Sequence, residues 1–193
     1  KPFIGNSAAA SHFQGRLYVA TYQEGLLSAA IDDLSKAPTN WQVHQGLGIV
    51  VNLFSHGDVL YVLTANLGVF QVQASTPVRI TKVLWSDNVG NEASVCAVSD
   101  TGGNVFFSGH NGVNILDSQN KDFEKLTVLQ GVHGQEFTQY GCGVLNGIPY
   151  LAGASGLTLI HSLENTSSEA PVVSWTHLEA DGKKLDLDNE HTS

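Results

Sequence analysis

Methionine is absent from this chain of 193 residues, and cysteine occurs only twice. Two cysteines cannot form the disulfide framework of a small secreted domain, and their wide separation does not match a zinc-binding motif. No apolar run approaches the roughly 20 residues of a membrane-spanning helix, so we expect a soluble chain without membrane insertion. The chain also lacks an initiator methionine and a charged-then-apolar leader at its start, which indicates a processed product or an excised piece.

Positive charge is scarce as well. Lysine and arginine together number 9 against 18 aspartates and glutamates, which gives a formal net charge of −9 at pH 7. Nucleic acids and anionic membrane surfaces are bound by clustered lysines and arginines. The composition therefore excludes both as expected partners.

The chain contains one sequence phrase that occurs four times. Each copy is a β-rich run, a short polar turn, a glycine and a second apolar run. The runs cover residues 17–21, 60–64, 105–109 and 149–153, and the glycines are Gly25, Gly68, Gly112 and Gly156. The glycines are 43, 44 and 44 residues apart, within the spacing of roughly 40 to 50 residues that is typical of propeller blades.

Two further strands complete each repeat. A short apolar run joined by a tight polar turn precedes each phrase, as at Gln14–Gly15 and Asn146–Gly147, where a two-residue hairpin is expected. A later run ends in a large residue, namely Trp41, Trp85, Leu129 or Trp175. The pattern predicts an all-β fold, a β-propeller of four-stranded antiparallel blades over residues 1–178, with units starting near 7, 49, 93 and 138. Residues 179–193, rich in acids, are expected to be a tail or linker.

A second series of glycines precedes the innermost strands, at Gly5, Gly48, Gly90 and Gly134. Residues 1–5 then correspond to the end of a preceding blade. We therefore favour part of a larger ring, completed by further blades of the same polypeptide or by another chain, over a closed ring of four blades.

The repeats resemble those of sialidase-type (BNR, Asp-box) propellers and of the sensor propellers of two-component regulators. The likeness rests on the run 17–21, on Gly25 with the apolar residues after it, and on Trp41. A full Asp-box reads Ser-x-Asp-x-Gly-x-x-Trp, whereas no glycine lies between Asp33 and Trp41. The resemblance implies a propeller, and the three-arginine clamp of sialidases is not available because the chain has only Arg16 and Arg79.

The repeat pattern also gives most of the conspicuous residues a structural role. The tryptophans at the ends of the units are expected to be wedges between blades. Cys96 and Cys142 occupy the same place in two repeats, so their side chains should point in the same direction around the axis. We therefore predict buried free thiols.

The residues left over lie in loops that share one face of a propeller. The predicted ligand-binding residues are Tyr22, Glu24, Asn66, Asp87, Asn88, His110, Asn111 and His133. Neutral amides dominate this rim, which favours recognition by directional hydrogen bonds over proton transfer. No cofactor is predicted. The histidines show no metal-type spacing, so no metal ligand is predicted. They also have no repeated spacing, so we interpret them as ordinary surface residues and predict no catalytic residue.

The favoured hypothesis is a non-catalytic binding module that recognises a protein or a glycan, in a secreted, periplasmic or cell-surface location. The alternative is a glycan-active hydrolase or lyase whose active site is completed by additional blades or another chain, with Glu24, Asp87 or Glu136 paired with His110 or His133. A structural sensor domain within a larger receptor is a third possibility.

Overall fold

The computed structural model describes residues 6–34, 41–73, 75, 77–83, 93–109, 112–117, 123–134, 136–161, 178–180 and 183–185. The chain divides into two compact units, Lys1–His161 and Ser162–Ser193. Among the described residues, no helix has the length and apolar character needed to cross a membrane.

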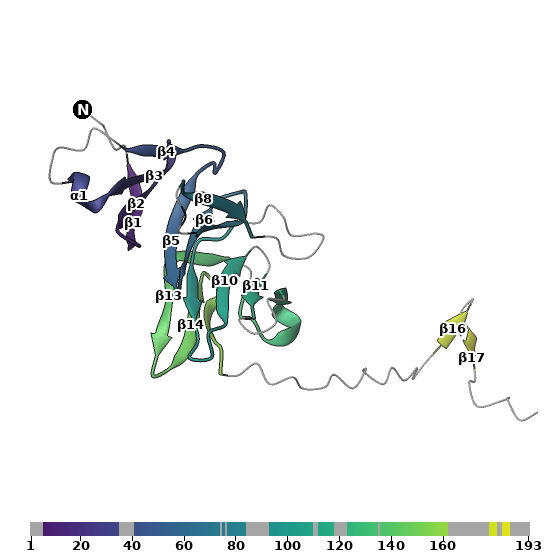
Figure 1. The fold of residues 1–193 in the computed structure, drawn as a ribbon. Coiled ribbons are helices and arrows are strands. Elements are labelled where there is room, and N and C mark those ends of the chain that lie inside the picture. Colours follow the sequence, from purple (N-terminus) through teal and green to yellow (C-terminus); the bar gives the residue numbers. More distant parts are fainter. Residues whose placement is uncertain are drawn as a thin grey trace, which may run out of the picture. The chain divides into compact units, whose positions relative to one another are not determined.

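The first unit consists of consecutive antiparallel sheets arranged as a four-blade β-propeller (Figure 1). Blade 1 contains β1 (Ser7–Phe13), β2 (Arg16–Thr21), β3 (Gly25–Ala30) and β4 (Gln42–His44), with the short helix α1 (Ile31–Leu34) after β3. Blade 2 contains β5 (Val50–His56), β6 (Val59–Thr64), β7 (Val69–Gln73) and β8 (Arg79–Lys82). Blade 3 contains β9 (Ala97–Ser99), β10 (Val105–Gly109), β11 (Gly112–Leu116) and β12 (Phe123–Leu126), followed by a 3₁₀ turn at Val128–Gln130. The described strands of blade 4 are β13 (Phe137–Leu145), β14 (Ile148–Gly153) and β15 (Gly156–Leu159). The predicted fold class is confirmed.

The hairpins between the first two strands of blades 1 and 4 have the expected turn chemistry. Gln14 and Gly15 both have positive φ, of 45° and 73°, and Asn146 and Gly147 have φ of 51° and 82°. Positive φ at both central residues matches the right-handed twist of the flanking strands. These turns set the register of β1 with β2 and of β13 with β14.

Apolar side chains fill the spaces between neighbouring blades. One cluster joins Tyr18 and Leu26 of blade 1 to Leu60 and Val62 of blade 2. A second cluster joins blade 2 to blade 3, and in it the rings of Tyr61 and Phe107 meet edge to face, 5.2 Å apart between centroids. The first three blades are thus stabilised by burial against one another, as stacked repeats require.

Side-chain links also connect the innermost strands around the axis. The hydroxyl of Ser11 in β1 lies 3.0 Å from that of Ser55 in β5. The amide of Asn52 donates to the carbonyl oxygen of Val95, which precedes β9 (3.0 Å). Strand β13 closes the circle, because the Tyr140 hydroxyl donates to the backbone carbonyl of Ala8 in β1.

The link between blades 3 and 4 is covalent and corrects the prediction of free thiols. Cys96 and Cys142 form a disulfide with a Cα–Cα distance of 6.1 Å. Cys142 pairs with Leu151 of β14 in blade 4. The equivalent pair in blade 3 is Ala97 with Phe107, so Cys142 corresponds to Ala97 and not to Cys96. The two cysteines are therefore one register position apart, and a shift of one residue turns a strand side chain to the opposite face of its sheet.

The ends of the repeats also differ from the prediction. Trp41 precedes β4 instead of ending it, and its side chain is only half buried. Leu129, which we expected to take the place of a terminal tryptophan, lies in the 3₁₀ turn and is 90% exposed. Trp85 and Trp175 lie outside the described residues.

The second unit contains one described hairpin, formed by β16 (Leu178–Ala180) and β17 (Lys183–Leu185). Glu179 pairs with Lys184 in its register. The predicted boundary at residue 178 and the acidic tail stay predictions.

Candidate binding groove at the loop face

At two glycines of the second series, Gly48 and Gly134, the connection between blades lies against the loop between the second and third strands of the next blade. A Cβ atom on Gly48, which has φ of +60°, would lie 3.1 Å from Leu67 Cδ1 and 3.3 Å from Asn66 Oδ1. A Cβ on Gly134, with φ of +100°, would lie 2.8 Å from the Cβ of Ser155. Glycine is favoured at both places because the backbone is left-handed and a loop lies directly against it. We call the end of the propeller formed by these loops and connections the loop face.

Two threonines hold the loops of blades 1 and 2 in the same way. The Thr21 hydroxyl accepts a hydrogen bond from the Glu24 N–H (2.9 Å) and donates one to the Gly25 carbonyl (3.0 Å). The Thr64 hydroxyl accepts from the Leu67 N–H (2.9 Å) and donates to the Gly68 carbonyl (2.7 Å). Both threonines are fully buried, so these contacts fix the loops that carry Glu24 and Asn66.

A groove of about 610 Å³ lies between these two loops and the connection from blade 1 to blade 2. Tyr22 is 41% exposed at its rim, and Val43 and Ile49 are exposed to a similar extent. The lining residues are 22–25 of the β2–β3 loop, 43–49 of β4 and the connection, and Asn66 and Leu67 of the β6–β7 loop. A smaller hollow of about 380 Å³ shares residues 43–47 and continues to Phe70, Val78 and Ile80.

The chemistry of the groove is that of neutral hydrogen-bonding groups beside one carboxylate. Gln23, Gln45 and Asn66 each offer an amide donor and an amide acceptor, and Glu24 supplies negative charge. The exposed ring of Tyr22 adds a flat apolar surface with a polar tip. Such a lining can align a ligand that carries both hydroxyl or amide groups and an apolar face.

A buried polar chain lies behind the groove. The His44 ring Nε2 lies 2.9 Å from the Ser28 hydroxyl, and the Arg16 guanidinium donates to the same hydroxyl (2.9 Å). Burial lowers the pKa of His44, and the nearby charge of Arg16 lowers it further. The Tyr18 ring stacks on His44, with centroids 6.4 Å apart, and burial raises the pKa of the Tyr18 phenol. His44 is therefore favoured as the neutral imidazole.

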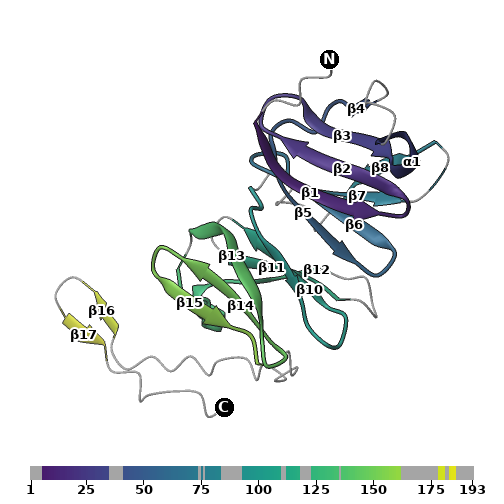
Figure 2. The same ribbon diagram turned by 90° about the vertical axis from the view of Figure 1, so that its left-hand side faces the viewer.

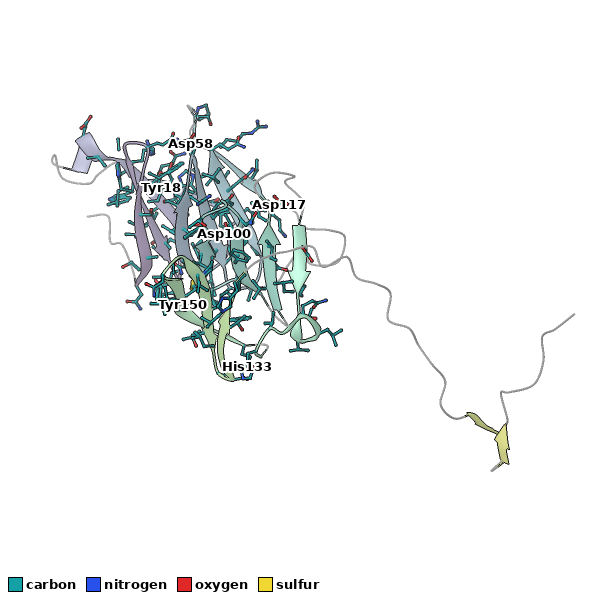
Figure 3. The ribbon with its side chains drawn as sticks, turned by 90° about the horizontal axis from the view of Figure 1, so that it is seen from below. Tyr18, Asp58, Asp100, Asp117, His133 and Tyr150 are labelled. Atoms are coloured by element: carbon teal, nitrogen blue, oxygen red, sulfur yellow. A yellow bond between two sulfur atoms is a disulfide. The ribbon has the colours of Figure 1, made fainter. Side chains whose placement is uncertain are left out.

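Three of the eight predicted binding residues line this one groove: Tyr22, Glu24 and Asn66. His133 lies in the connection between blades 3 and 4, with its ring against Gly156 and its N–H donating to the Thr158 hydroxyl (2.9 Å; Figure 3). The other four, Asp87, Asn88, His110 and Asn111, lie outside the described residues. The pairing of Glu24 with His110 or His133 that an enzyme would need stays a prediction.

Sequence reasoning missed the part of the groove formed by the connection between blades, above all His44, Gln45 and Gly46. The signal for it was Gly48, which we had used only to mark a boundary between blades. Tyr140 was missed as well. It has φ of 62°, which is rare for a bulky residue, and it lies where the pairing of β13 with β14 is irregular. Burial raises the pKa of the Tyr140 phenol, and the charge of the Tyr22 phenolate raises it further.

Within the described ranges, no group of three or more histidine, cysteine, aspartate or glutamate side chains is arranged to hold a metal ion. The groove is lined by neutral amides, one carboxylate, one tyrosine and His44.

The fold and the groove define a β-propeller with a ligand-sized depression at its loop face. No model of a known protein family matches the chain. No curated protein matches it by sequence.

Solved structures do match. The extracellular domain of the hybrid two-component system BT3049 from B. thetaiotaomicron is 14% identical with a TM-score of 0.55, and covers 80% of this chain and 20% of its own. The extracellular domain of the one-component system BT4673 from the same organism is 15% identical with a TM-score of 0.60, covering 79% and 21%. The computationally designed Ika4 protein is 12% identical with a TM-score of 0.57, covering 80% and 89%. The chain thus spans about a fifth of the length of these two extracellular domains, and these likenesses show a shared fold.

Proposed function

We propose that this chain is a non-catalytic propeller module that binds a ligand in the groove between blades 1 and 2. The observation that carries the proposal is the convergence of Tyr22, Glu24 and Asn66 on one depression from loops 42 residues apart in sequence, counted from Glu24 to Asn66. Concave sites with a few convergent polar groups are the usual places where ligands bind. The extracellular sensor domains of similar fold are consistent with such a role.

The ligand class that suits the groove is a glycan or an exposed segment of a protein. Both carry hydroxyl or amide groups that pair with the amides of Gln23, Gln45 and Asn66, and both offer an apolar face to Tyr22. The likeness to sialidase-type repeats stays part of this proposal. It adds glycans to the ligands that need testing.

We further propose an extracytoplasmic location. Disulfides persist in oxidising compartments, and Cys96–Cys142 is such a bond within the propeller. The location of the structurally similar domains outside the cell supports the same assignment.

The test is a binding screen of the whole chain against an oligosaccharide array and a peptide array, followed by titration calorimetry with the strongest binder. Replacement of Tyr22 by alanine removes the exposed ring and should weaken binding by about 10-fold or more, the equivalent of about 1.4 kcal/mol. Asn66→Ala should weaken it several-fold, because one or two hydrogen bonds are lost.

Leu129→Ala is the matched control, since Leu129 is exposed on blade 3 and does not line the groove. Its affinity should equal that of the native chain. The proposal is wrong if neither array yields a binder, or if the binder is held equally well by Tyr22→Ala and Asn66→Ala.

A further inference from the structure

One side chain of the groove is not explained by the repeat. Glu24 occupies the place that Leu67 occupies in blade 2, three residues after the buried threonine of each loop. In both loops the backbone N–H of this residue donates to the threonine hydroxyl over 2.9 Å. The hydrogen bond uses only the backbone, and a leucine supports the same loop. The fold therefore does not require the carboxylate of Glu24.

This carboxylate gives the groove its charge. Glu24 is exposed and lines the groove together with the amides of Gln23, Gln45 and Asn66. The described part of the lining contains no lysine or arginine, and His44 is favoured as the neutral imidazole. A carboxylate in a depression attracts cations strongly, because the low-dielectric walls concentrate its field. The net charge of the chain, −9, acts in the same direction.

The apolar part of the groove is largely aliphatic. Val43 on β4 and Ile49 in the connection to β5 are both exposed and line the groove. Such side chains can pack against the methylene stem of lysine or arginine, whose charged end then stays in a polar place. Tyr22 is the one exposed ring among the described lining residues, and its face can attract a cation. A sugar, in contrast, packs its flat face on aromatic rings and gains less from branched aliphatic groups.

The groove is held in one shape before a ligand arrives. The sheets of blades 1 and 2, which Figure 2 shows side by side, bury a shared apolar cluster. Thr21 fixes the loop that carries Glu24, and Thr64 fixes the loop that carries Asn66. A preformed site avoids the entropy cost of ordering its loops, so a short ligand segment can bind to it.

We propose that the groove selects a basic side chain, a lysine or an arginine on an exposed segment of a partner protein. The cationic end pairs with the Glu24 carboxylate, and the methylene stem packs on Val43 and Ile49. The amides of Gln45 and Asn66 bond to the peptide backbone of the partner. Glu24 is then the residue that determines specificity, a role that rests on the proposed function of the groove.

A peptide library with one fixed position tests this selection. The peptides are acetylated and amidated, so that their ends are uncharged, and carry lysine, arginine, norleucine or glutamate between randomised neutral residues. The whole chain should retain lysine and arginine peptides. It should bind the best of them at least about 5-fold more tightly than the norleucine version, which keeps the stem and lacks the charge. The glutamate version should bind more weakly still.

Glu24→Gln keeps the shape of the side chain and removes its charge. In this variant the affinity for the lysine peptide should fall at least about 5-fold, to that of the norleucine peptide, whose own affinity should not change. Asp58→Asn is the matched control, since Asp58 is exposed in the turn between β5 and β6 and does not line the groove. It removes the same charge from the chain and should preserve the preference for lysine. Far-UV circular dichroism checks that both variants are folded.

Ionic strength gives a second measurement. Raising sodium chloride from about 0.05 M to about 0.5 M should weaken binding of the lysine peptide more than binding of the norleucine peptide, because salt screens the ion pair. This difference should be smaller in Glu24→Gln.

The selection of a basic side chain is wrong if the lysine and norleucine peptides bind equally well, or if Glu24→Gln keeps the native preference. It is also wrong if the strongest binder is a glycan. A glycan or a neutral peptide that Tyr22→Ala and Asn66→Ala bind more weakly would still support the proposed function, so the two proposals can fail separately. A chain that binds no glycan and no peptide overturns both.

Discussion

The protonation equilibrium of His44 is shifted by its surroundings. It is 8% exposed, it bonds to Ser28, and the Arg16 guanidinium reaches the same hydroxyl. A second positive charge at this place would be repelled by Arg16 and removed from water. The structure therefore holds His44 neutral beside the groove.

This environment makes the free energy of unfolding depend on pH. The pKa of folded His44 is lowered, so the unfolded chain binds the proton more readily. The stabilisation is complete above the unfolded pKa of about 6.5 and is lost as the pH falls through the lower folded pKa. Urea unfolding at neutral and at mildly acidic pH should show a smaller acid-induced loss for His44→Gln than for the native chain. An equal loss in both proteins would mean that His44 is not responsible.

Residues of the site were predictable where a loop interrupted the repeat. Tyr22, Glu24 and Asn66 were identified in this way, and the structure brings them to one groove. His44 was not identifiable, because it lies at the end of a strand and its role depends on Arg16, 28 residues earlier in the sequence. Proximity of that kind is set by the pairing of β2 with β3 and of β3 with β4, and it is not visible in a linear pattern.

At the scale of strands, the repeat predicted which segments pair but not every register. The bulge between Phe137 and Cys142 shifts β13 relative to β14, and so Cys142 faces Cys96. A repeat comparison assumes equal register in each copy and cannot show such a shift. The same comparison located the hairpin turns correctly because their chemistry is local.

The disulfide should contribute substantially to the free energy of unfolding. It closes a loop with a sequence separation of 46 residues, and loop-closure entropy for that length corresponds to about 4 kcal/mol. The double variant Cys96→Ala with Cys142→Ala should therefore lower the guanidinium midpoint strongly. A reducing agent should lower the midpoint of the native protein and leave that of the double variant unchanged.

Thiol counting supplies the control. The denatured, unreduced native protein should consume no thiol reagent, and the denatured, reduced protein should consume two equivalents per chain. Labelling without reduction would show that the bond is absent.

The fold class of the whole molecule was predictable from the sequence, but the contacts between its blades were not. Spacing alone gave a propeller of four repeats, because each blade has the same length and the same turn chemistry. The links across the axis, such as Gln139 to the Val51 carbonyl (2.7 Å), join residues 88 apart and have no signature in the repeat.

The bond between Cys96 and Cys142 also encloses every strand of blade 3 in a covalent ring, since β9 to β12 all lie between the two cysteines. When the chain is pulled from its two ends, tension passes from residue 96 to residue 142 through the sulfur atoms. A separation of 46 residues corresponds to roughly 150 to 165 Å of extended backbone, none of which is released. Blade 3 would remain mechanically shielded after its neighbours had been drawn out.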